Sequence, residues 1–130
     1  MKKYLKPGIA LCLMVILVMA VVPVWAIDSS ENIVCQTYES NVYAFGATRK
    51  TGTSSPGGQA HGSNGSSSFS TLVAYVATST HSGVSSTFVY VPAGYNRSGS
   101  AVTLTANAYY CIGLYFEYGY SSGSGTAVIS

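Results

Sequence analysis

The sequence predicts an all-β fold: a small antiparallel β-sandwich or partly open barrel of about six to eight short strands, after a cleaved N-terminal signal helix. Three observations support this. Apolar and polar residues alternate with the two-residue period of a strand, most clearly over 102–120. All but one of the 14 glycines and all but one of the 11 tyrosines follow residue 26, and these residues favour turns and strands over helices. No segment beyond residue 26 shows the 3.6-residue periodicity of an amphipathic helix.

Residues 1–26 have the layout of a secretory signal peptide. Three lysines in the first six residues precede an uncharged apolar run over 7–22, and Val24 and Ala26 supply small residues at the −3 and −1 positions of a cut after Ala26. Pro23 favours cleavage because it interrupts the helix just before that cut. The alternative is an uncleaved anchor, since about 20 apolar residues can span a bilayer. We expect a secreted, extracellular bacterial protein that meets the membrane only through this leader before cleavage.

The charges divide at the same boundary. The full chain carries a net charge of +2, but half of its six basic residues lie in the leader. Residues 27–130 keep Arg49, Lys50 and Arg97 against four acidic residues, so this part is slightly acidic and poor in charge. That excludes a basic nucleic-acid-binding face. About 100 residues make one domain, so we expect a single β-domain over 27–130.

The sequence of the first half of this domain predicts three features in order. Segments 33–39 and 42–48 are short strand candidates, and Ser40-Asn41 between them reads as a two-residue hairpin turn. Segment 49–68 is rich in Gly, Ser and Thr, which predicts a surface loop or a weak polar edge hairpin.

The second half predicts the remaining strands. Segment 69–78 is apolar on both faces and predicts a central strand, and 86–91 predicts another that ends at Pro92. Every even position of 102–120 is apolar, yet 19 extended residues would span roughly 60 Å, so the segment must bend. Either it passes from one sheet to another, or it makes a three-residue hairpin loop near Asn107. Segment 121–125 predicts a turn and 126–129 a short last strand.

Two cysteines remain after the leader is removed, Cys35 and Cys111, and in an exported chain an even pair predicts a disulfide. The alternative is two separate buried thiols. Parity places Cys111 on the face opposite Ile112, so we expect the bridge on the less apolar side of its strand. The spacing of the cysteines and of the two isolated histidines gives no metal site, and we expect no cofactor.

The catalytic candidates are weak. The only aspartate, Asp28, lies near the start of the domain, so neither His61 nor His81 has an acid to orient it for nucleophilic catalysis. A glycosidase would need Glu39 and Glu117 about 5 to 10 Å apart. If Cys35 and Cys111 lie opposite each other on antiparallel strands, these two acids fall at opposite ends. We therefore expect no enzyme.

Tyrosine is the enriched residue with binding potential, because its flat amphipathic ring gives contact area at low entropic cost. The candidate binding surface comprises Tyr90, Tyr95, Tyr115, Tyr118 and Tyr120. The alternative is that these rings pack the sheets. We expect a small secreted, non-catalytic binding or interaction module for an extracellular protein or a cell-surface ligand. A self-associating filament or coat subunit and a secreted bacteriocin or toxin are the alternatives, and the low charge is compatible with self-association.

Overall fold

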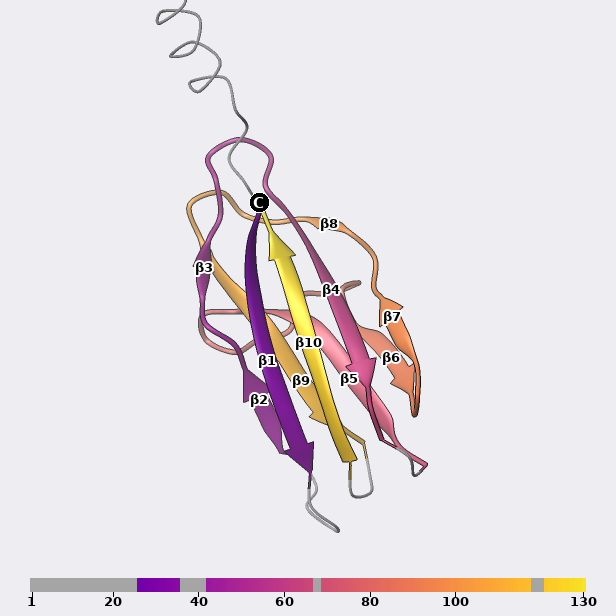
Figure 1. The fold of residues 1–130 in the computed structure, drawn as a ribbon. Coiled ribbons are helices and arrows are strands. Elements are labelled where there is room, and N and C mark those ends of the chain that lie inside the picture. Colours follow the sequence, from indigo (N-terminus) through magenta and orange to yellow (C-terminus); the bar gives the residue numbers. More distant parts are fainter. Residues whose placement is uncertain (1–25, 36–41, 67–68, 118–120) are drawn as a thin grey trace, which may run out of the picture.

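The computed structural model describes residues 26–35, 42–66, 69–117 and 121–130, and these residues form two antiparallel β-sheets packed face to face. The predicted all-β sandwich is confirmed, and the described part contains no helix. Figure 1 shows one sheet in front of the other. Within the described part no helix is long and apolar enough to cross a membrane. The leader predicted over 1–26 lies outside the described residues except for Ala26.

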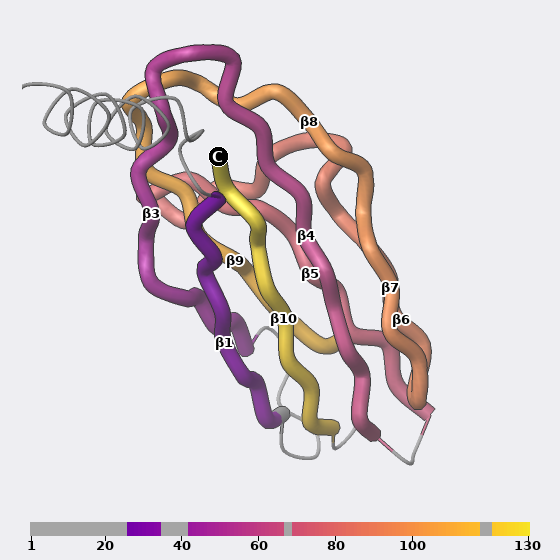
Figure 2. The backbone as a smooth tube through the Cα atoms, turned by 45° about the horizontal axis from the view of Figure 1, so that its top comes forward, coloured from indigo at the N-terminus to yellow at the C-terminus, as the bar shows by residue number. Residues whose placement is uncertain are grey.

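The front sheet, sheet A, contains the first and last strands of the domain. Its order is β1 (Ile27–Cys35), β10 (Ser121–Ile129), β4 (Gly57–Asn64) and β7 (Asn96–Ser98), and β8 (Val102–Thr103) pairs with the other end of β4. All nine residues of β1 pair with β10, from Ile27 opposite Ile129 to Cys35 opposite Ser121. Figure 2 shows these two strands side by side.

The rear sheet, sheet B, carries the longest apolar strands. Its order is β2 (Tyr43–Phe45), β9 (Tyr109–Phe116), β5 (Thr71–Thr78) and β6 (Val89–Pro92), and β3 (Arg49–Lys50) pairs with the start of β9. β5 lies between β9 and β6 and is buried over its six inner residues, which confirms the predicted central strand. The strand predicted over 86–91 begins only at Val89 and forms an edge.

The core lies between the sheets, and the two sheets contribute side chains of different size to it. Sheet B supplies large aliphatic side chains such as Leu72, Ile112 and Leu114, whereas sheet A supplies alanine and glycine at several facing positions. Gly62 of β4 pairs directly with Gly125 of β10. A Cβ atom on Gly62 would lie 2.8 Å from Val91 Cγ2, and one on Gly125 would lie 2.5 Å from Leu114 Cδ2. Both distances are too short for ordinary packing, so glycine is what lets the sheets approach here.

A buried serine joins the sheets beside this core. Ser29 of β1 is fully buried, and its hydroxyl donates to the carbonyl of Ala47 at 2.6 Å. The same oxygen accepts from the backbone N–H of Ile112 at 3.1 Å. Ile112 lies on β9 between the stretches that pair with β2 and β3, so Ser29 satisfies a donor that neither strand reaches.

The predicted hairpin of 33–39 and 42–48 is wrong. β1 pairs with β10 in sheet A, and β2 pairs with β9 in sheet B, so the two segments belong to different sheets. The reason is that Ile33 and Ala44 both contact the core from opposite sides, which strands of one sheet cannot do. The proposed turn at Ser40-Asn41 lies outside the described residues.

Two segments predicted as turn or loop are interior strands. Within 49–68, the strand β4 lies between β10 and the short strands β7 and β8. Within 121–129, the strand β10 begins at Ser121 and not after Gly125. Glycine and serine look like turn formers in sequence, but in these strands Gly62, Gly123 and Gly125 occupy positions where a Cβ would lie too close to side chains of sheet B.

The long alternating segment 102–120 crosses between the sheets, as the first of its two predicted solutions requires. β8 belongs to sheet A and β9 to sheet B. Between them Asn107 adopts a left-handed backbone with φ of 53°, a conformation that asparagine tolerates better than most residues.

The glycine contact predicts a measurable cost at Gly62. Gly62→Ala is expected to lower the free energy of unfolding by about 1–3 kcal/mol, because the added methyl overpacks the space against Val91 and Ala74. Urea unfolding followed by circular dichroism measures this. Gly52→Ala is the control, since a Cβ there meets no atom closer than 4.0 Å. Equal stability of the two variants would contradict the packing account.

The serine bridge predicts a second cost. Ser29→Ala is expected to destabilise the protein by about 1–3 kcal/mol, because it leaves the buried N–H of Ile112 without its acceptor. The matched control is Ser30→Ala, whose exposed hydroxyl lies 3.3 Å from that of Thr126 and should matter by less than about 0.5 kcal/mol. Amide exchange at Ile112 should accelerate in Ser29→Ala alone.

Candidate ligand-binding site: an aromatic groove on sheet B

The outer face of sheet B carries an open groove walled by aromatic side chains. Its volume is about 480 Å³. We call it the aromatic groove; its lining residues are Tyr43, Phe45, Tyr75, His81, Gly83, Phe88 and Tyr115. Strands β2, β5 and β9 supply four of these residues, and the segment between β5 and β6 supplies the other three.

Strand parity and one glycine place these rings together. Tyr115 of β9 lies between Tyr43 of β2 and Val73 of β5, and in the next outward-facing row Gly113 lies between Phe45 and Tyr75. A Cβ on Gly113 would lie 2.5 Å from the ring of Tyr75. Glycine therefore leaves room for Tyr75 to lie across β9, where it forms the buried floor of the groove.

Several of the rings are steeply inclined to one another, although Tyr43 and Phe45 lie nearly parallel, at 11° with centroids 6.4 Å apart. Phe45 stacks on His81 at a centroid distance of 3.8 Å, and Tyr75 stacks on Phe88 at 4.6 Å. The planes of Phe45 and Tyr75 cross at 86°, those of Tyr75 and Tyr115 at 61°. Tyr43 and Tyr115 meet at 49° with their centroids 5.3 Å apart. A concave site bounded by ring faces and edges results.

A strained turn holds the imidazole in this wall. His81 has a φ of 67°, a left-handed conformation that costs energy for a residue with a side chain. The turn is closed by the backbone N–H of His81 donating to the carbonyl of Thr78 at 2.9 Å, and by the N–H of Thr78 donating to Ser82 at 2.8 Å. The stack on Phe45 lies at the end of this turn.

The hydroxyl groups of the tyrosines gather at the groove. Burial raises the pKa of Tyr75 to about 12, and the nearby Tyr43, Tyr115 and Cys111 add to the shift because a second negative charge among them is unfavourable. Burial also raises the pKa of Tyr115, followed by the effects of Tyr90 and Glu117. Tyr75 and Tyr115 therefore stay neutral at neutral pH and present hydroxyl groups to the groove.

The predicted disulfide between Cys35 and Cys111 is corrected by the structure. Cys111 is a free, buried thiol beneath the groove, packed with Val73, Tyr75 and Ala77 on the face of β9 that points away from sheet A. Cys35 lies on β1, six residues beyond Ser29, which contacts the backbone beside Cys111. Six extended residues span about 20 Å, and a disulfide requires Cα atoms within about 7 Å. The predicted face of Cys111 is confirmed, and burial raises the pKa of its thiol.

The tyrosines predicted to form one binding surface do not all lie together. Tyr115 lines the groove, and the exposed Tyr90 hydrogen-bonds to it from β6. Tyr95 lies elsewhere, with the guanidinium of Arg97 5.5 Å above its ring. Tyr118 and Tyr120 are outside the described residues. Sequence reasoning missed six groove residues: Tyr43, Phe45, Tyr75, His81, Gly83 and Phe88. The strand parity of Tyr43, Phe45 and Tyr75 can be read from the sequence, but their meeting depends on the pairing of β2, β9 and β5.

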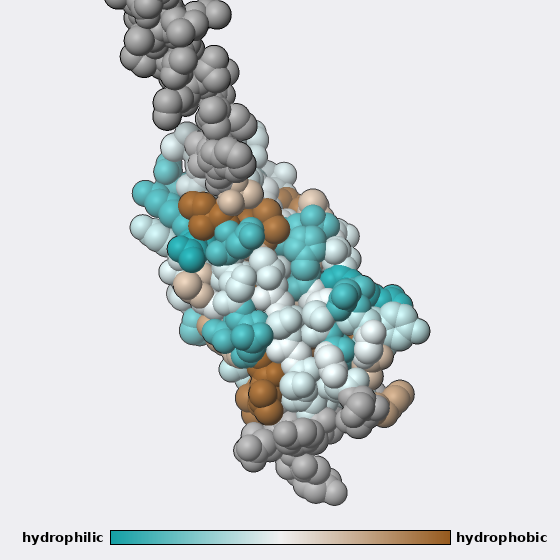
Figure 3. Space-filling model, viewed as in Figure 1, coloured by the Kyte–Doolittle hydropathy of each residue, from teal (hydrophilic) through white to brown (hydrophobic). Residues whose placement is uncertain are grey.

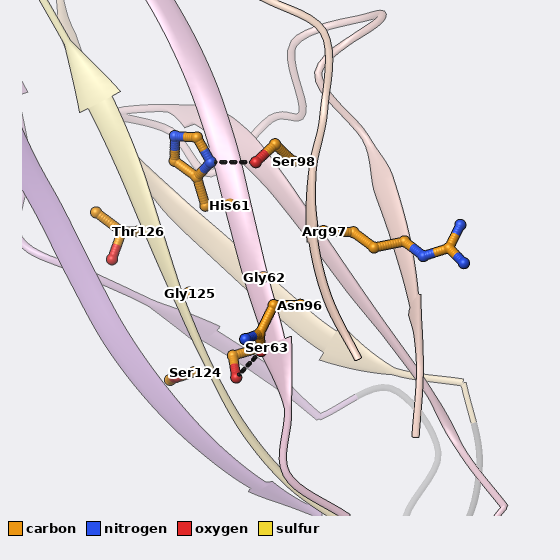
Figure 4. Close-up of a pocket in the computed structure, with 9 residues that line it drawn as sticks. All are labelled: His61, Gly62, Ser63, Asn96, Arg97, Ser98, Ser124, Gly125 and Thr126. Atoms are coloured by element: carbon orange, nitrogen blue, oxygen red, sulfur yellow. Dashed lines mark hydrogen bonds between the residues drawn. The ribbon is translucent and has the colours of Figure 1, made fainter. Parts of the chain in front are cut away.

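A second, polar hollow of about 370 Å³ lies on the outer face of sheet A (Figure 4). The Nδ1 atom of His61 lies 2.6 Å from the hydroxyl of Ser98, and Ser63 donates to the side-chain oxygen of Asn96 at 2.6 Å. Figure 3, which shows this face, is mainly pale or hydrophilic over β10 and β4.

The serine and histidine of this hollow lack the third member of a catalytic triad. None of the described residues that line the hollow is an aspartate or glutamate. Asp28 and Glu31 are on β1, separated from β4 by the full width of β10. No described residues form a group of three or more candidate metal ligands. Of the carboxylate pair considered for glycoside hydrolysis, Glu39 lies outside the described residues.

The burial of Tyr75 predicts a pH dependence of stability. The unfolded chain releases this proton near pH 10 and the folded protein near 12, so the stability contributed by the neutral phenol is fully present below pH 10 and is lost as pH rises through 12. Tyr75→Phe should flatten the fall in the urea midpoint between pH 10 and 12. Tyr109→Phe, a change at an exposed ring on β9 outside the groove, should keep the wild-type slope. An unchanged slope in Tyr75→Phe would count against the assignment.

Comparison with known proteins adds no function to this geometry. No protein-family model, no curated protein and no solved structure matches the chain. What the chain does is therefore inferred from the chemistry of the aromatic groove.

Proposed function

We propose that this chain is a small exported, non-catalytic binding module that takes its ligand in the aromatic groove. The groove itself carries the proposal. Its rings are held by stacking and by the sheet, yet Tyr43 is 49% exposed and Phe88 is 38% exposed. Exposed aromatic surface gathered in a concavity with converging hydroxyl groups is typical of a ligand site.

The rigidity of the groove supports binding further. Tyr75 is fixed by Phe88 on one side and by the close approach of Gly113 on another. A ligand that contacts rings already held in place loses less affinity to the ordering of side chains. The groove is therefore organised before the ligand arrives.

The chemistry of the nucleophiles supports a non-catalytic role. A reactive cysteine needs a lowered thiol pKa, whereas burial raises that of Cys111. Ser98 contacts His61, but no carboxylate orients the imidazole within the described hollow. Both arrangements favour recognition over catalysis.

Export is part of the proposal and rests on the leader. A cut after Ala26 would release a chain whose first residue, Ile27, is also the first residue of β1. Cleavage at this position would thus leave the whole of β1 available to pair with β10.

A binding survey by NMR tests the proposal. The leader-free, ¹⁵N-labelled domain is titrated with choline, N-acetylglucosamine and a tri-proline peptide, three probes that aromatic surfaces bind in different ways. At least one probe should shift the resonances of groove residues, and Tyr43→Ala should weaken its binding about tenfold.

The matched control is Tyr109→Ala, which removes an exposed tyrosine from β9 outside the groove and should change affinity less than about twofold. Shifts confined to sheet A, or no shifts with any probe, would contradict the proposal. Light scattering on the same sample tests the alternative of a self-associating subunit. If the protein forms concentration-dependent oligomers whose interface protects the groove, self-association would replace ligand binding as the role of the groove.

A further inference from the structure

We propose that the ligand of the aromatic groove is a quaternary ammonium cation of the choline type, without an adjoining phosphate; this rests on the proposed function. The groove provides electron-rich ring faces at steep angles to one another, and negative charge is found at its margin.

The angles between the rings favour a rounded cation over a flat ligand. A sugar or a planar ring stacks best on an open, flat aromatic surface, but here the rings of Tyr43 and Tyr115, neither of which is buried, meet at 49° above the buried ring of Tyr75. Their centroids lie 5.3 Å apart. A trimethylammonium group is roughly spherical and can contact both rings at once, each within the 6 Å or so at which cation–π attraction acts.

The charges around the groove point the same way. No described residue that lines it is Lys, Arg, Asp or Glu. Among the described residues, the carboxylate of Glu117 acts on the phenol of Tyr115, which lies two residues before it at the same strand parity. An acidic group at the margin of an aromatic concavity attracts a cation and repels an anion.

The basic residues of the domain are placed elsewhere. Arg49 donates from Nε to the backbone carbonyl of Asp28 on β1, and Lys50 pairs with Tyr109 at the opposite end of β9 from Tyr115. Arg97 lies over Tyr95. Among the described residues, no arginine or lysine is therefore placed to hold a phosphate beside the groove, which is why the proposal specifies a cation without one.

The same chain already contains one contact of this kind. The guanidinium of Arg97 lies 5.5 Å from the centroid of Tyr95, which is itself 56% exposed. In the groove the rings of Tyr43 and Tyr115 together replace that single one, so a cation there meets more aromatic surface.

Titrations with choline and its neutral isostere test the inference. In 3,3-dimethylbutan-1-ol a tert-butyl group replaces the trimethylammonium, so shape is kept and charge is lost. Choline is expected to bind with a Kd of about 1 mM or lower, and the isostere at least about tenfold more weakly. Phosphocholine should bind more weakly than choline, and phosphatidylcholine vesicles should not retain the protein, since both carry the phosphate that the groove does not accommodate.

Four variants locate the effect. Tyr43→Ala should weaken choline binding about tenfold, and Glu117→Gln by a few-fold with a smaller dependence on salt. Tyr109→Ala should bind as wild type does. Each variant's fold is checked by its ¹⁵N spectrum. Tyr43→Phe keeps the ring and should retain most of the choline affinity, as expected if the weaker binding of Tyr43→Ala reflects the missing ring and not a packing defect.

The outcomes separate the inference from the function on which it rests. Equal affinity for choline and the isostere, tighter binding of phosphocholine, or binding of the saccharide or tri-proline probe alone in the groove would overturn the inference and leave a binding groove. No binding of any probe would overturn both.

Discussion

The close approach of the two sheets is the constraint on which the rest of the molecule depends. Sheet A has a glycine pair, Gly62 opposite Gly125, and an alanine pair, Ala60 opposite Ala127, at its centre, and the large residues of sheet B fill the space that they leave. The core is thus filled largely by aliphatic side chains from one sheet. Most described tyrosines are not needed there and lie at least partly exposed, where they are available for contact.

The two outer faces consequently differ in chemistry. Sheet A presents short polar side chains joined to one another, as in the contact of His61 with Ser98. Sheet B presents rings whose mutual angles are set by Gly113 and by the left-handed backbone of His81. The aromatic groove depends on packing as much as the core does, because a side chain at residue 113 would displace the floor residue Tyr75.

Sequence alone was enough to predict the sandwich and a central strand over 69–78, of which Thr71–Thr78 forms β5, because each leaves a period or a composition that neighbouring residues determine. A bend within 102–120 was also predicted, but the choice between crossing the sheets and a hairpin near Asn107 depends on the strand order. The prediction failed for two strands that contain glycine, because glycine occurs both in turns and at positions of close sheet packing. A glycine in a turn and a glycine under a facing leucine look the same in sequence, so β4 and the first part of β10 were predicted as loop and turn. Of the groove's lining residues, only Tyr115 was identified from the sequence, for a related reason: its joining to Tyr43, Phe45 and Tyr75 is a property of strand order across more than 70 residues. The disulfide was predicted from cysteine number, which carries no information on distance.

The position of β10 in sheet A affects how the molecule can be assembled. β10 lies between β1 and β4, so the two flanking strands have no edge to join until residues 121–129 are present. When the chain emerges amino end first from a ribosome, β1 appears almost 90 residues before its partner. Sheet A then closes as a late, long-range event, which favours slow folding. The strand that completes the sheet would thereby also determine when the protein becomes a folded domain.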